Sequence, residues 1–465
     1  MDHRSDLFSE FEAKMHAAGV KDAPRRAFRH SFERLQAGDT GLIPENSIQA
    51  AGQLPALEDI RANTRSEPGL LSQVVMLKLN GGLGTSMGLE RAKSLLPVKD
   101  GLTFLDFIAK QVLHLRKQHN VPLRFVLMNS YSTSGDTLEA LRKYPELSSP
   151  EDLELMQSQA PKVDARTRHP VSWPANPQLE WCPPGHGDIY PSLVASGLLE
   201  RWLKQGCKYL FVSNSDNLGA SLDLDVLTYF ARAGSPFMME VAARTPSDSK
   251  GGHLARREGR LLLRESAQCP KEDLAQFQDI QKHRYFNTNN LWIQLESLHQ
   301  LLEQSGGFLP LPLIKNEKTV DPRDRSSTPV FQLETAMGAA IQCFENSSAL
   351  LVPRSRFAPV KTTSDLLALR SDAYEVTADW RIILGGPRKP PTIDLDPDHF
   401  KLVDQLEQAL ESGVPSLKDC QELTVRGPVR LGSTNTFRGK VTIMNTSTKP
   451  RPLPPGVYQD CTRQL

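Results

Sequence analysis

The chain has 465 residues, 39% hydrophobic and 23% charged, which is typical of a globular protein with two or three domains. Its 55 lysines and arginines balance 54 aspartates and glutamates, so the bulk charge favours no nucleic-acid partner. The start lacks the apolar core of a signal peptide, no apolar run reaches about 18 residues, and the six cysteines form no Cys-x-x-Cys pair. We therefore expect a reduced, cytoplasmic protein without membrane spans, a disulfide framework or a thiolate zinc site.

Residues 1–70 are expected to form a helical N-terminal segment. Two apolar stripes at helical spacing predict two helices, each ended by a glycine: Leu7, Phe11 and Met15 before Gly19, and Phe28, Phe32 and Leu35 before Gly38. Both stripes are predicted to pack against the main domain, and neither carries a chemical role.

Residues 71–385 alternate between strand and helix patterns, which predicts a mixed, mainly parallel α/β domain. The expected elements are strands over 74–79, 123–128, 209–212 and 236–243, and helices over 104–119 and 138–144. Arg257-Glu-Gly259 predicts a hairpin turn. The peptide from Phe331 to Thr335 is expected to start a helix. Ligands of such a sheet gather at the carboxyl ends of its parallel strands.

Residues 386–465 are expected to form a third domain after the linker Gly385-Gly386-Pro387. Apolar residues recur there every six positions, with small residues two places later: Val425, Leu431, Phe437 and Ile443, followed by Gly427, Ser433, Gly439 and Asn445. This hexad is typical of a β-helix. Two ordinary hairpins are the alternative interpretation.

The apolar run from Val74 to Leu79 leads into a loop with glycines at 81, 82, 84 and 88, followed by Arg91 and Lys93. Glycine tolerates positive φ and lets backbone N–H groups approach a ligand, so the loop is a candidate phosphate or nucleotide cradle. Met87 stands where a dinucleotide fingerprint needs glycine, and no Gly-Lys-Ser/Thr follows. A nucleotide loop and a plain tight turn both remain open.

Two further peptides have the composition of a site. His186 lies between two glycines after two prolines, so we expect its ring to be presented from an exposed turn, with a structural histidine as the alternative. Asp216 follows the strand predicted over 209–212 and is a candidate Mg²⁺ ligand, because Mg²⁺ takes few carboxylates plus substrate oxygens. Asn214 is a neighbouring donor. An Asx turn or helix cap would explain the same cluster.

Two more peptides carry candidate site residues on weaker sequence patterns. The amides of Phe286-Asn-Thr-Asn-Asn-Leu-Trp292 suit a polyhydroxyl ligand, although backbone capping explains them equally well. The stretch from Pro353 to Thr363 carries Lys361, for which a solvated surface charge is the alternative. A glycine cradle, a metal carboxylate, extra cations and amides on an α/β sheet favour phosphoryl or nucleotidyl transfer, where catalysis is mainly positioning and charge neutralisation.

Peptides in this order closely resemble those of the eukaryotic-type UTP–glucose-1-phosphate uridylyltransferases, also called UDP-glucose pyrophosphorylases. They are Lys78-Leu-Asn-Gly-Gly-Leu-Gly-Thr-Ser-Met-Gly88, Pro183-Pro-Gly-His-Gly-Asp-Ile-Tyr190, Ser215-Asp-Asn-Leu-Gly219, Phe286-Asn-Thr-Asn-Asn-Leu-Trp292 and Pro353-Arg-Ser-Arg-Phe-Ala-Pro-Val-Lys-Thr-Thr-Ser-Asp365. The likeness runs from about Asn46 through the hexads. It implies a nucleotide-binding α/β domain followed by a left-handed β-helix.

The resemblance also implies a role for each residue. Leu79, Asn80, Gly81 and Gly82 would offer backbone to the uridine, Lys93 would bind the UTP phosphates, Gln157 would read the uracil edge and Gly185 would lie by the nucleotide. His186 would contact the sugar phosphate, Asn214 and Asn289 the sugar, Asp216 would bind Mg²⁺, and Lys361 would be the catalytic lysine over the phosphates.

The implied reaction joins UTP and glucose 1-phosphate into UDP-glucose and pyrophosphate, reversibly and with Mg²⁺, by direct in-line attack. A pyrophosphorylase for other UDP-sugars or UDP-N-acetylhexosamine, and a catalytically silent nucleotide-sugar binder, are the alternatives. Family members form homo-oligomers through the C-terminal domain. Here the tail after Met444 is rich in proline, where relatives often continue the β-helix, so their assembly state is not carried over.

Overall fold

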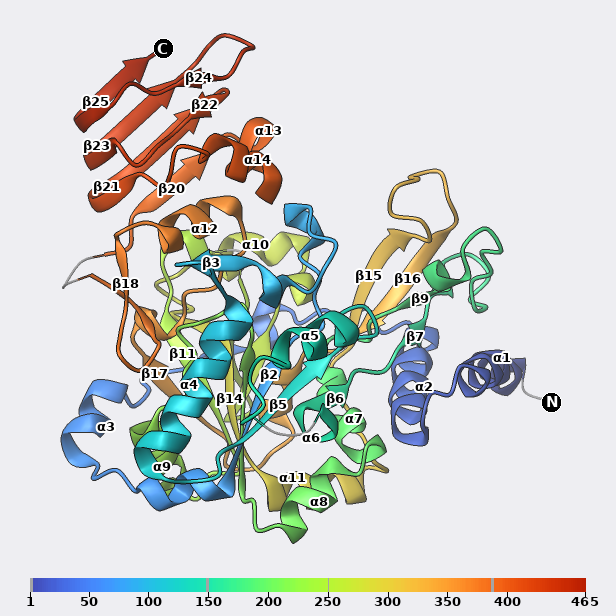
Figure 1. The fold of residues 1–465 in the computed structure, drawn as a ribbon. Coiled ribbons are helices and arrows are strands. Elements are labelled where there is room, and N and C mark those ends of the chain that lie inside the picture. The colour runs from blue at the N-terminus through green and yellow to red at the C-terminus, as the bar shows by residue number, and fades with distance from the viewer. Residues whose placement is uncertain (1–2, 148–149, 250, 386–388) are drawn as a thin grey trace.

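The computed structural model describes residues 3–147, 150–249, 251–385 and 389–465. A central sheet with helices on both faces forms the body, two N-terminal helices lie at one side, and a separate stack of C-terminal strands projects from one end (Figure 1). Among the described residues, no helix is long and apolar enough to cross a membrane.

The central sheet of the described residues has ten strands and is mixed, as predicted, but it is not mainly parallel, because four of its strand pairs are parallel and five antiparallel. Its longest run of parallel strands consists of β10 (Tyr209–Asn214), β2 (Val74–Leu79), β5 (Arg124–Asn129) and β6 (Glu154–Met156). The other strands are β14 (Tyr285–Gln294), β11 (Phe237–Ala243), β17 (Ser348–Val352), β12 (His253–Arg257), β13 (Arg260–Arg264) and β1 (Gln49–Ala50). Glu258 and Gly259 adopt φ of 52° and 79° between β12 and β13, so the predicted hairpin is confirmed.

Helices cover both faces because successive side chains of each strand point to opposite sides. In β2, Val74 and Met76 pack into one core and Val75 and Leu77 into the other. The first core includes α4 (Phe104–His119), which begins at a capping box made by Thr103 and Asp106. The remaining helices of the body are α3 (Leu57–Asn63), α5 (Ser134–Leu141), α6 (Pro150–Leu153), α7 (Ile189–Ala195), α8 (Leu198–Lys204), α9 (Leu224–Ala233), α10 (Leu274–Phe277), α11 (Leu295–Gln304) and α12 (Thr363–Arg370).

The two predicted N-terminal helices are α1 (His3–Ala17) and α2 (Asp22–Gln36), and Gly19 and Gly38 follow them with positive φ. Their apolar stripes form one core with Phe331 and Leu333 of β16 (Pro329–Glu334), the strand that pairs with β15 (Ile314–Thr319). Residues 49–63 then join the central body through β1 and α3. The division at residues 70 and 385 stays a prediction.

The helix expected to start at Phe331 is wrong, because this peptide belongs to strand β16. Its side chains alternate, with Phe331 and Leu333 buried and Gln332 and Glu334 half-buried. That period of two is a strand pattern, and the pairing of β16 with β15 and β8 (Val163–Asp164) satisfies its backbone. The smaller pairs elsewhere are β3 (Pro97–Lys99) with β4 (Leu102–Thr103), β7 (Ala160–Pro161) with β9 (Trp181–Cys182), and β18 (Tyr374–Val376) with β19 (Ile382–Leu384).

The C-terminal strands β20 (Thr392–Leu395), β21 (Ser416–Arg426), β23 (Asn435–Met444) and β25 (Gly456–Gln464) form one parallel sheet, and β22 (Val429–Arg430) pairs in parallel with β24 (Arg451–Pro452). Helices α13 (Pro397–Phe400) and α14 (Val403–Ala409) lie beside them. Antiparallel hairpins are therefore excluded. All four apolar hexad residues are buried, and Val425 lies opposite Ile443, three hexads later.

The proline-rich tail does not end this stack, contrary to the departure noted from the sequence. Strands β24 and β25 continue it beyond Met444, with Val457 opposite Thr436. The prolines at 454 and 455 lie between these strands, where no ladder N–H is required. Residues 386 and 387 of the expected linker lie outside the described residues.

Candidate active site

The predicted site residues gather where the parallel strands β2, β5 and β10 end. Leu79 lies opposite Asn214 on one side and Met128 on the other. The backbone N–H of Ser215 donates to Leu79 O at 3.0 Å, and that of Asn80 donates to Met128 O at 2.7 Å. The glycine loop and the Asn214–Asp216 peptide therefore leave the sheet side by side.

The glycine loop is anchored at its start by Asn80. Its buried side chain donates to Asn129 Oδ1 at 2.7 Å and to Thr137 Oγ1 at 2.9 Å, so it orients the loop rather than facing a ligand. Positive φ occurs at Gly84 and Gly88 and not at Gly81 or Gly82. Gly81 is needed for space instead, because a Cβ there would lie 2.9 Å from Gln157 Oε1.

Gln157 joins this loop to the histidine peptide. Its Nε2 donates to Gly185 O at 3.0 Å, and its backbone N–H donates to Asn129 O at 2.8 Å. A buried amide held between Gly81 and Gly185 has both a donor and an acceptor near the backbone of the loop. The sequence offered no signal for Gln157 apart from the family resemblance.

His186 differs from the exposed turn that was expected. The ring is half-buried, and its Nδ1 accepts the backbone N–H of Met337 at 2.9 Å. Burial lowers the pKa of His186 to about 4, so the imidazole is neutral at pH 7 and carries its proton on Nε2. Gly185 has φ of 81°, and a Cβ there would lie 2.4 Å from Thr335 O. Gly185 and Gly187 thus allow the turn to pack closely against Thr335, and the turn is not exposed.

Asp188 stabilises the turn that carries His186. Its buried carboxylate accepts Ser158 N at 2.7 Å, Ser158 Oγ at 2.6 Å and Ser192 Oγ at 2.7 Å. Burial raises the pKa of Asp188 to about 6, against the lowering effect of these hydrogen bonds. Asp188 therefore links the peptide after Gln157 to the turn that carries His186.

Asp216 is ion-paired with Lys93, whose Nζ lies 2.7 Å from Asp216 Oδ2. The lysine is held by its own backbone, since Lys93 N donates to Gly82 O at 3.1 Å. Asp216 Oδ1 is buried and has no hydrogen-bond partner among the described residues. In the part of the chain that the structure describes, the Asp216 carboxylate forms no Asx turn or helix cap. Asn217 makes the backbone contacts of this peptide, with its Oδ1 accepting Ala358 N at 3.0 Å.

The residues present fit a Mg²⁺ ion held mainly by substrate oxygens. No group of three or more carboxylate, histidine or cysteine side chains could hold a metal among the described residues. Mg²⁺ in nucleotide sites commonly takes one or two carboxylates plus phosphate oxygens and waters. A single carboxylate with one unpartnered buried oxygen, beside a lysine, matches that donor set.

Lys361 lies on a segment attached to the Asp216 peptide. Val360 N donates to Asp216 O at 3.2 Å, and Lys361 N donates to Asp365 Oδ2 at 2.8 Å at the start of α12. The Lys361 side chain is exposed, with its Nζ 5.9 Å from the ring centroids of Phe286 and Phe357. The backbone therefore brings the Lys361 segment next to Asp216, and among the described residues no ion pair engages the Lys361 side chain.

Asn289 occupies a bulge in the β11–β14 ladder. The register shifts between Glu240 and Val241, and Asn289 adopts φ of 59°. Asn287 Oδ1 accepts Asn289 N, and Asn287 Nδ2 donates to Asn289 Oδ1, both at 2.9 Å. Capping thus accounts for Asn287, while the bulge turns Asn289 out of the regular strand pattern.

Several charged residues of the site were missed. Lys78 is buried in β2, donates to Ala220 O at 2.6 Å, and has a pKa lowered by burial to about 7. Glu240 and Arg356 form a buried ion pair at 2.7 Å. Glu265 lies near Lys361, and burial raises its pKa. A charge inside an apolar strand run, as at Lys78 and Glu240, was the available signal, because such residues are rarely buried unpaired.

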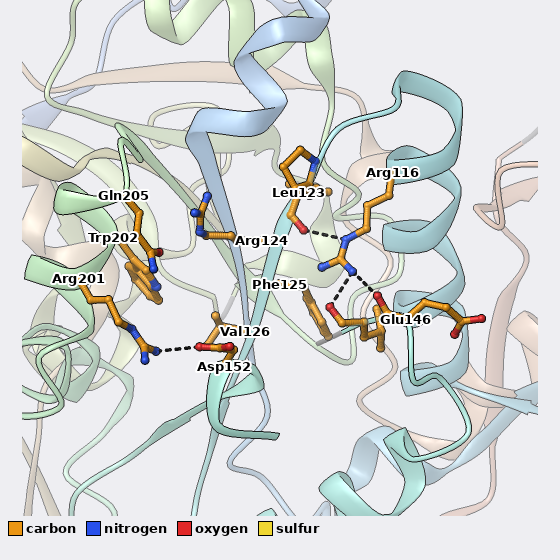
Figure 2. A pocket seen from close by; sticks show the side chains of 12 residues that line it. Arg116, Leu123, Arg124, Phe125, Val126, Glu146, Asp152, Arg201, Trp202 and Gln205 are labelled. Atoms are coloured by element: carbon orange, nitrogen blue, oxygen red, sulfur yellow. Dashed lines mark hydrogen bonds and ion pairs between the residues drawn. The ribbon is translucent and has the colours of Figure 1, made fainter. Parts of the chain in front are cut away.

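A cavity of about 510 Å³ lies elsewhere, at the start of β5, and Figure 2 shows its lining. It contains none of the predicted site residues. Its arginines are engaged, with Arg116 donating to the carbonyls of Leu123, Glu146 and Leu147 and Arg201 paired with Asp152 at 3.3 Å. This end of the sheet is opposite to the strand ends that carry the candidate site.

Comparison with known proteins gives consistent matches along the whole chain. The family model of UTP–glucose-1-phosphate uridylyltransferase matches residues 26–438. The protein of that name from Solanum tuberosum is 41% identical over 450 residues, covering 94% of this chain and 91% of the relative. The one from Encephalitozoon cuniculi is 38% identical over 421 residues, covering 90% and 82%.

Solved structures are equally similar. A point mutant of UDP-glucose pyrophosphorylase from Leishmania major, in complex with UDP-glucose, has a TM-score of 0.94 and 48% identity, covering 99% of both chains. A UDP-glucose phosphorylase from Trypanosoma brucei has a TM-score of 0.91 and 49% identity, covering 99% of this chain and 100% of that one.

Proposed function

This chain belongs to the UTP–glucose-1-phosphate uridylyltransferase family, and we propose that it transfers uridylyl from UTP to glucose 1-phosphate, giving UDP-glucose and pyrophosphate reversibly. The observation that best supports a catalytic member of the family is the meeting of Lys93, Asp216 and the Lys361 segment at the ends of β2 and β10. A silent binder would have no need of this arrangement of charges.

The nucleotide is proposed to lie on the glycine loop. The backbone from Leu79 to Gly82 is open to a ligand at Gly82, where an added Cβ would meet nothing within 4 Å. Gln157, held between Gly81 and Gly185, is suited to read the uracil edge because its amide can donate and accept. Lys93 is placed to neutralise the phosphates of UTP.

The sugar phosphate is proposed to lie across the ends of the same strands. His186 is neutral with its Nδ1 occupied by Met337 N, which leaves Nε2–H to donate to a phosphate or hydroxyl oxygen. Asn214 at the end of β10 and Asn289 at the bulge of β14 are proposed sugar contacts. Amides suit hydroxyl groups because each both donates and accepts.

Asp216 is the proposed ligand for Mg²⁺, through its unpartnered oxygen Oδ1. When bound, the ion would supply positive charge to the phosphates and so offset repulsion between the two anionic substrates. Lys93 pairs with Oδ2 and so orients the carboxylate.

The reaction requires no proton transfer at the nucleophile. A phosphate oxygen of glucose 1-phosphate, already an anion, forms a bond to the α-phosphorus of UTP while the bond from that phosphorus to the bridging oxygen breaks and pyrophosphate leaves. Lys93 and Lys361 are proposed to stabilise the charge of the transition state. No general base is needed, so His186 serves as a neutral hydrogen-bond donor.

The sugar specificity is tested by a substrate panel. We expect pyrophosphate release with UTP and glucose 1-phosphate at least ~10-fold faster than with galactose 1-phosphate or N-acetylglucosamine 1-phosphate, because a few polar pocket contacts can discriminate to that extent. Comparable rates across the panel would favour a broader UDP-sugar pyrophosphorylase. Binding of UDP-glucose without turnover on any sugar 1-phosphate would favour the silent binder.

The proposal extends to the C-terminal fold, the assembly and the location of the protein. The three-hexad spacing between Val425 and Ile443, with parallel pairing, supports a short left-handed β-helix. The stack could join copies of the chain into a homo-oligomer through its terminal strand β25. Free cysteines at all six described positions suit a reducing, cytoplasmic location.

A further inference from the structure

We propose that Glu240 is a positioning residue for uridylyl transfer, whose buried carboxylate holds together the segments that carry Lys361, Asp216 and Asn289. This inference rests on the proposed function. Glu240 itself lies in the middle of β11 and is fully buried, and its side-chain partners Arg356, Trp292 and Asn290 are not among the proposed substrate contacts. Its role would therefore be exerted through its partners.

The carboxylate of Glu240 is fully hydrogen-bonded. Oε1 accepts Arg356 Nη2 at 2.7 Å and Trp292 Nε1 at 2.9 Å, and Oε2 accepts Arg356 Nε at 2.8 Å and Asn290 Nδ2 at 3.0 Å. Arg356 thus binds it with two parallel hydrogen bonds, the geometry that most restricts an arginine. One carboxylate thereby joins β11, β14 and the segment that follows β17.

Arg356 transmits this restraint to the Asp216 peptide. Its side chain is 7% exposed and also donates to Ser221 O at 3.2 Å, and its carbonyl accepts Asn217 Nδ2 at 3.1 Å. The backbones approach so closely that a Cβ on Gly219 would lie 2.3 Å from Ser355 O. The turn at Arg356 is therefore fixed against the loop that carries Asp216, five residues before Lys361.

The same carboxyl-bearing residue fixes the bulge at Asn289. Thr288 Oγ1 donates to Glu240 O at 2.7 Å, and the register shift of the ladder falls directly after Glu240. Asn290, next to Asn289, donates to the carboxylate. Both neighbours of Asn289 are consequently held by Glu240, which fixes the position of Asn289 and its positive φ between them.

A purely structural role is the competing explanation. A buried ion pair contributes little net stability compared with well-packed apolar residues, because desolvation of both charges opposes their attraction. A fully satisfied polar network does, however, fix one arrangement of the segments it joins. Glu240 is thus better explained by geometric restraint on the site than by stability alone.

The test is a double-mutant cycle in the full-length chain with Glu240→Gln and Lys361→Ala. Glu240→Gln preserves shape but removes the charge that orients Arg356. We expect kcat for UDP-glucose formation to fall by at least ~10-fold with the KM for UTP within ~3-fold, since only interactions of the transition state are disturbed. In the Lys361→Ala background, the same change should cost clearly less than it does in the wild-type chain, because part of its effect acts through Lys361.

Glu45→Gln is the matched control. Glu45 pairs with Arg264 at 2.5 Å, and both side chains are buried, but they lie outside the site. We expect Glu45→Gln to lower stability while leaving kcat within ~2-fold, as for a structural pair remote from the reacting groups. An equal loss of kcat in Glu45→Gln and Glu240→Gln would overturn the proposal, and so would independent, multiplying effects of Glu240→Gln and Lys361→Ala.

If Glu240→Gln does not fold, Arg356→Lys replaces it in the double-mutant cycle. Lysine keeps the buried positive charge but loses the parallel hydrogen bonds, so the same fall in kcat and the same coupling to Lys361→Ala are expected. A kcat equal to wild type in folded Arg356→Lys would contradict the role. Absence of UDP-glucose formation by the wild-type chain would instead refute the proposed function, which separates the two failures.

Discussion

Lys93 Nζ lies 2.7 Å from Asp216 Oδ2, although the two residues are 123 positions apart in the chain. The cation proposed for the UTP phosphates is thus paired with the carboxylate proposed for the metal. Both side chains are only partly exposed, so the pair is less screened by solvent than a surface ion pair. Each residue is expected to influence what the other binds.

Lys93→Met is expected to change metal binding and catalysis in opposite directions. Without its lysine, Asp216 should bind Mn²⁺, used as a spectroscopic substitute for Mg²⁺, roughly 3- to 10-fold more tightly in the absence of nucleotide, the scale of a modest ion pair. The kcat/KM for UTP should fall, because phosphate charge is no longer neutralised. Electron paramagnetic resonance titration measures the first effect and steady-state assay the second.

The matched control for Lys93→Met is Lys99→Met. Lys99 donates to the carbonyl of Ser371 at 2.6 Å and has no contact with Asp216. Mn²⁺ affinity should be unchanged in this variant. Equal Mn²⁺ affinities for wild type and Lys93→Met would mean that Asp216 does not take the metal.

Gln157→Ala is expected to weaken discrimination between nucleotides. Its amide lies between Gly81 and Gly185, and loss of one base-reading hydrogen-bonding group should lower kcat/KM for UTP by roughly 10- to 100-fold. The preference for UTP over CTP should shrink with it. Gln159→Ala, two positions along the chain, is the control and should retain the preference. An unchanged UTP/CTP ratio in Gln157→Ala would exclude base recognition by this side chain.

His186 is expected to stay neutral throughout the physiological range. Its pKa is lowered to about 4 by burial, so its ring resonances in nuclear magnetic resonance should not titrate between pH 5 and 8. In the unfolded chain the same ring binds a proton near pH 6.5. The unfolded state therefore gains protons first on acidification, and the contribution of neutral His186 to stability is lost as pH falls from about 6.5 to about 4.

Urea denaturation of wild type and His186→Asn checks the sign of this effect. The difference between their free energies of unfolding should be larger at pH 7 than at pH 5. Asp188, whose pKa is raised to about 6, acts in the opposite direction but is present in both proteins. A difference that grows on acidification, or a ring that titrates near pH 6.5, would show that His186 is charged in the native state.

The elements of the fold were largely readable from local patterns. The continuous apolar run of β2 and the capping pair at Thr103 and Asp106 are local signals, and the structure has the strand and the helix at those positions. Phe331–Thr335 was misread because a short alternating peptide was judged without its pairing partner. The hexads were readable since each one contributes a buried residue at a fixed spacing.

The supporting contacts of the site could not be read in this way. Glu240 and Arg356 are 116 residues apart, and neither has a sequence feature that names the other. His186 was expected in an exposed turn because its partner, the backbone of Met337, lies 151 residues away and leaves no residue-type signal. Residue type thus suggested which side chains could bind substrate or take part in catalysis. Long-range packing determines which of them come into contact, and it leaves no local pattern in the sequence.

The most direct test of the account is steady-state pyrophosphate release from UTP and glucose 1-phosphate, with Mg²⁺, by wild type and Lys361→Ala. Wild type should form one UDP-glucose for each pyrophosphate. Lys361→Ala should keep its fold, because its side chain is exposed, and lose roughly 10²- to 10³-fold in kcat, the scale expected for one donor to transition-state charge. Near-normal turnover by folded Lys361→Ala, or no pyrophosphate release by wild type, would contradict the account.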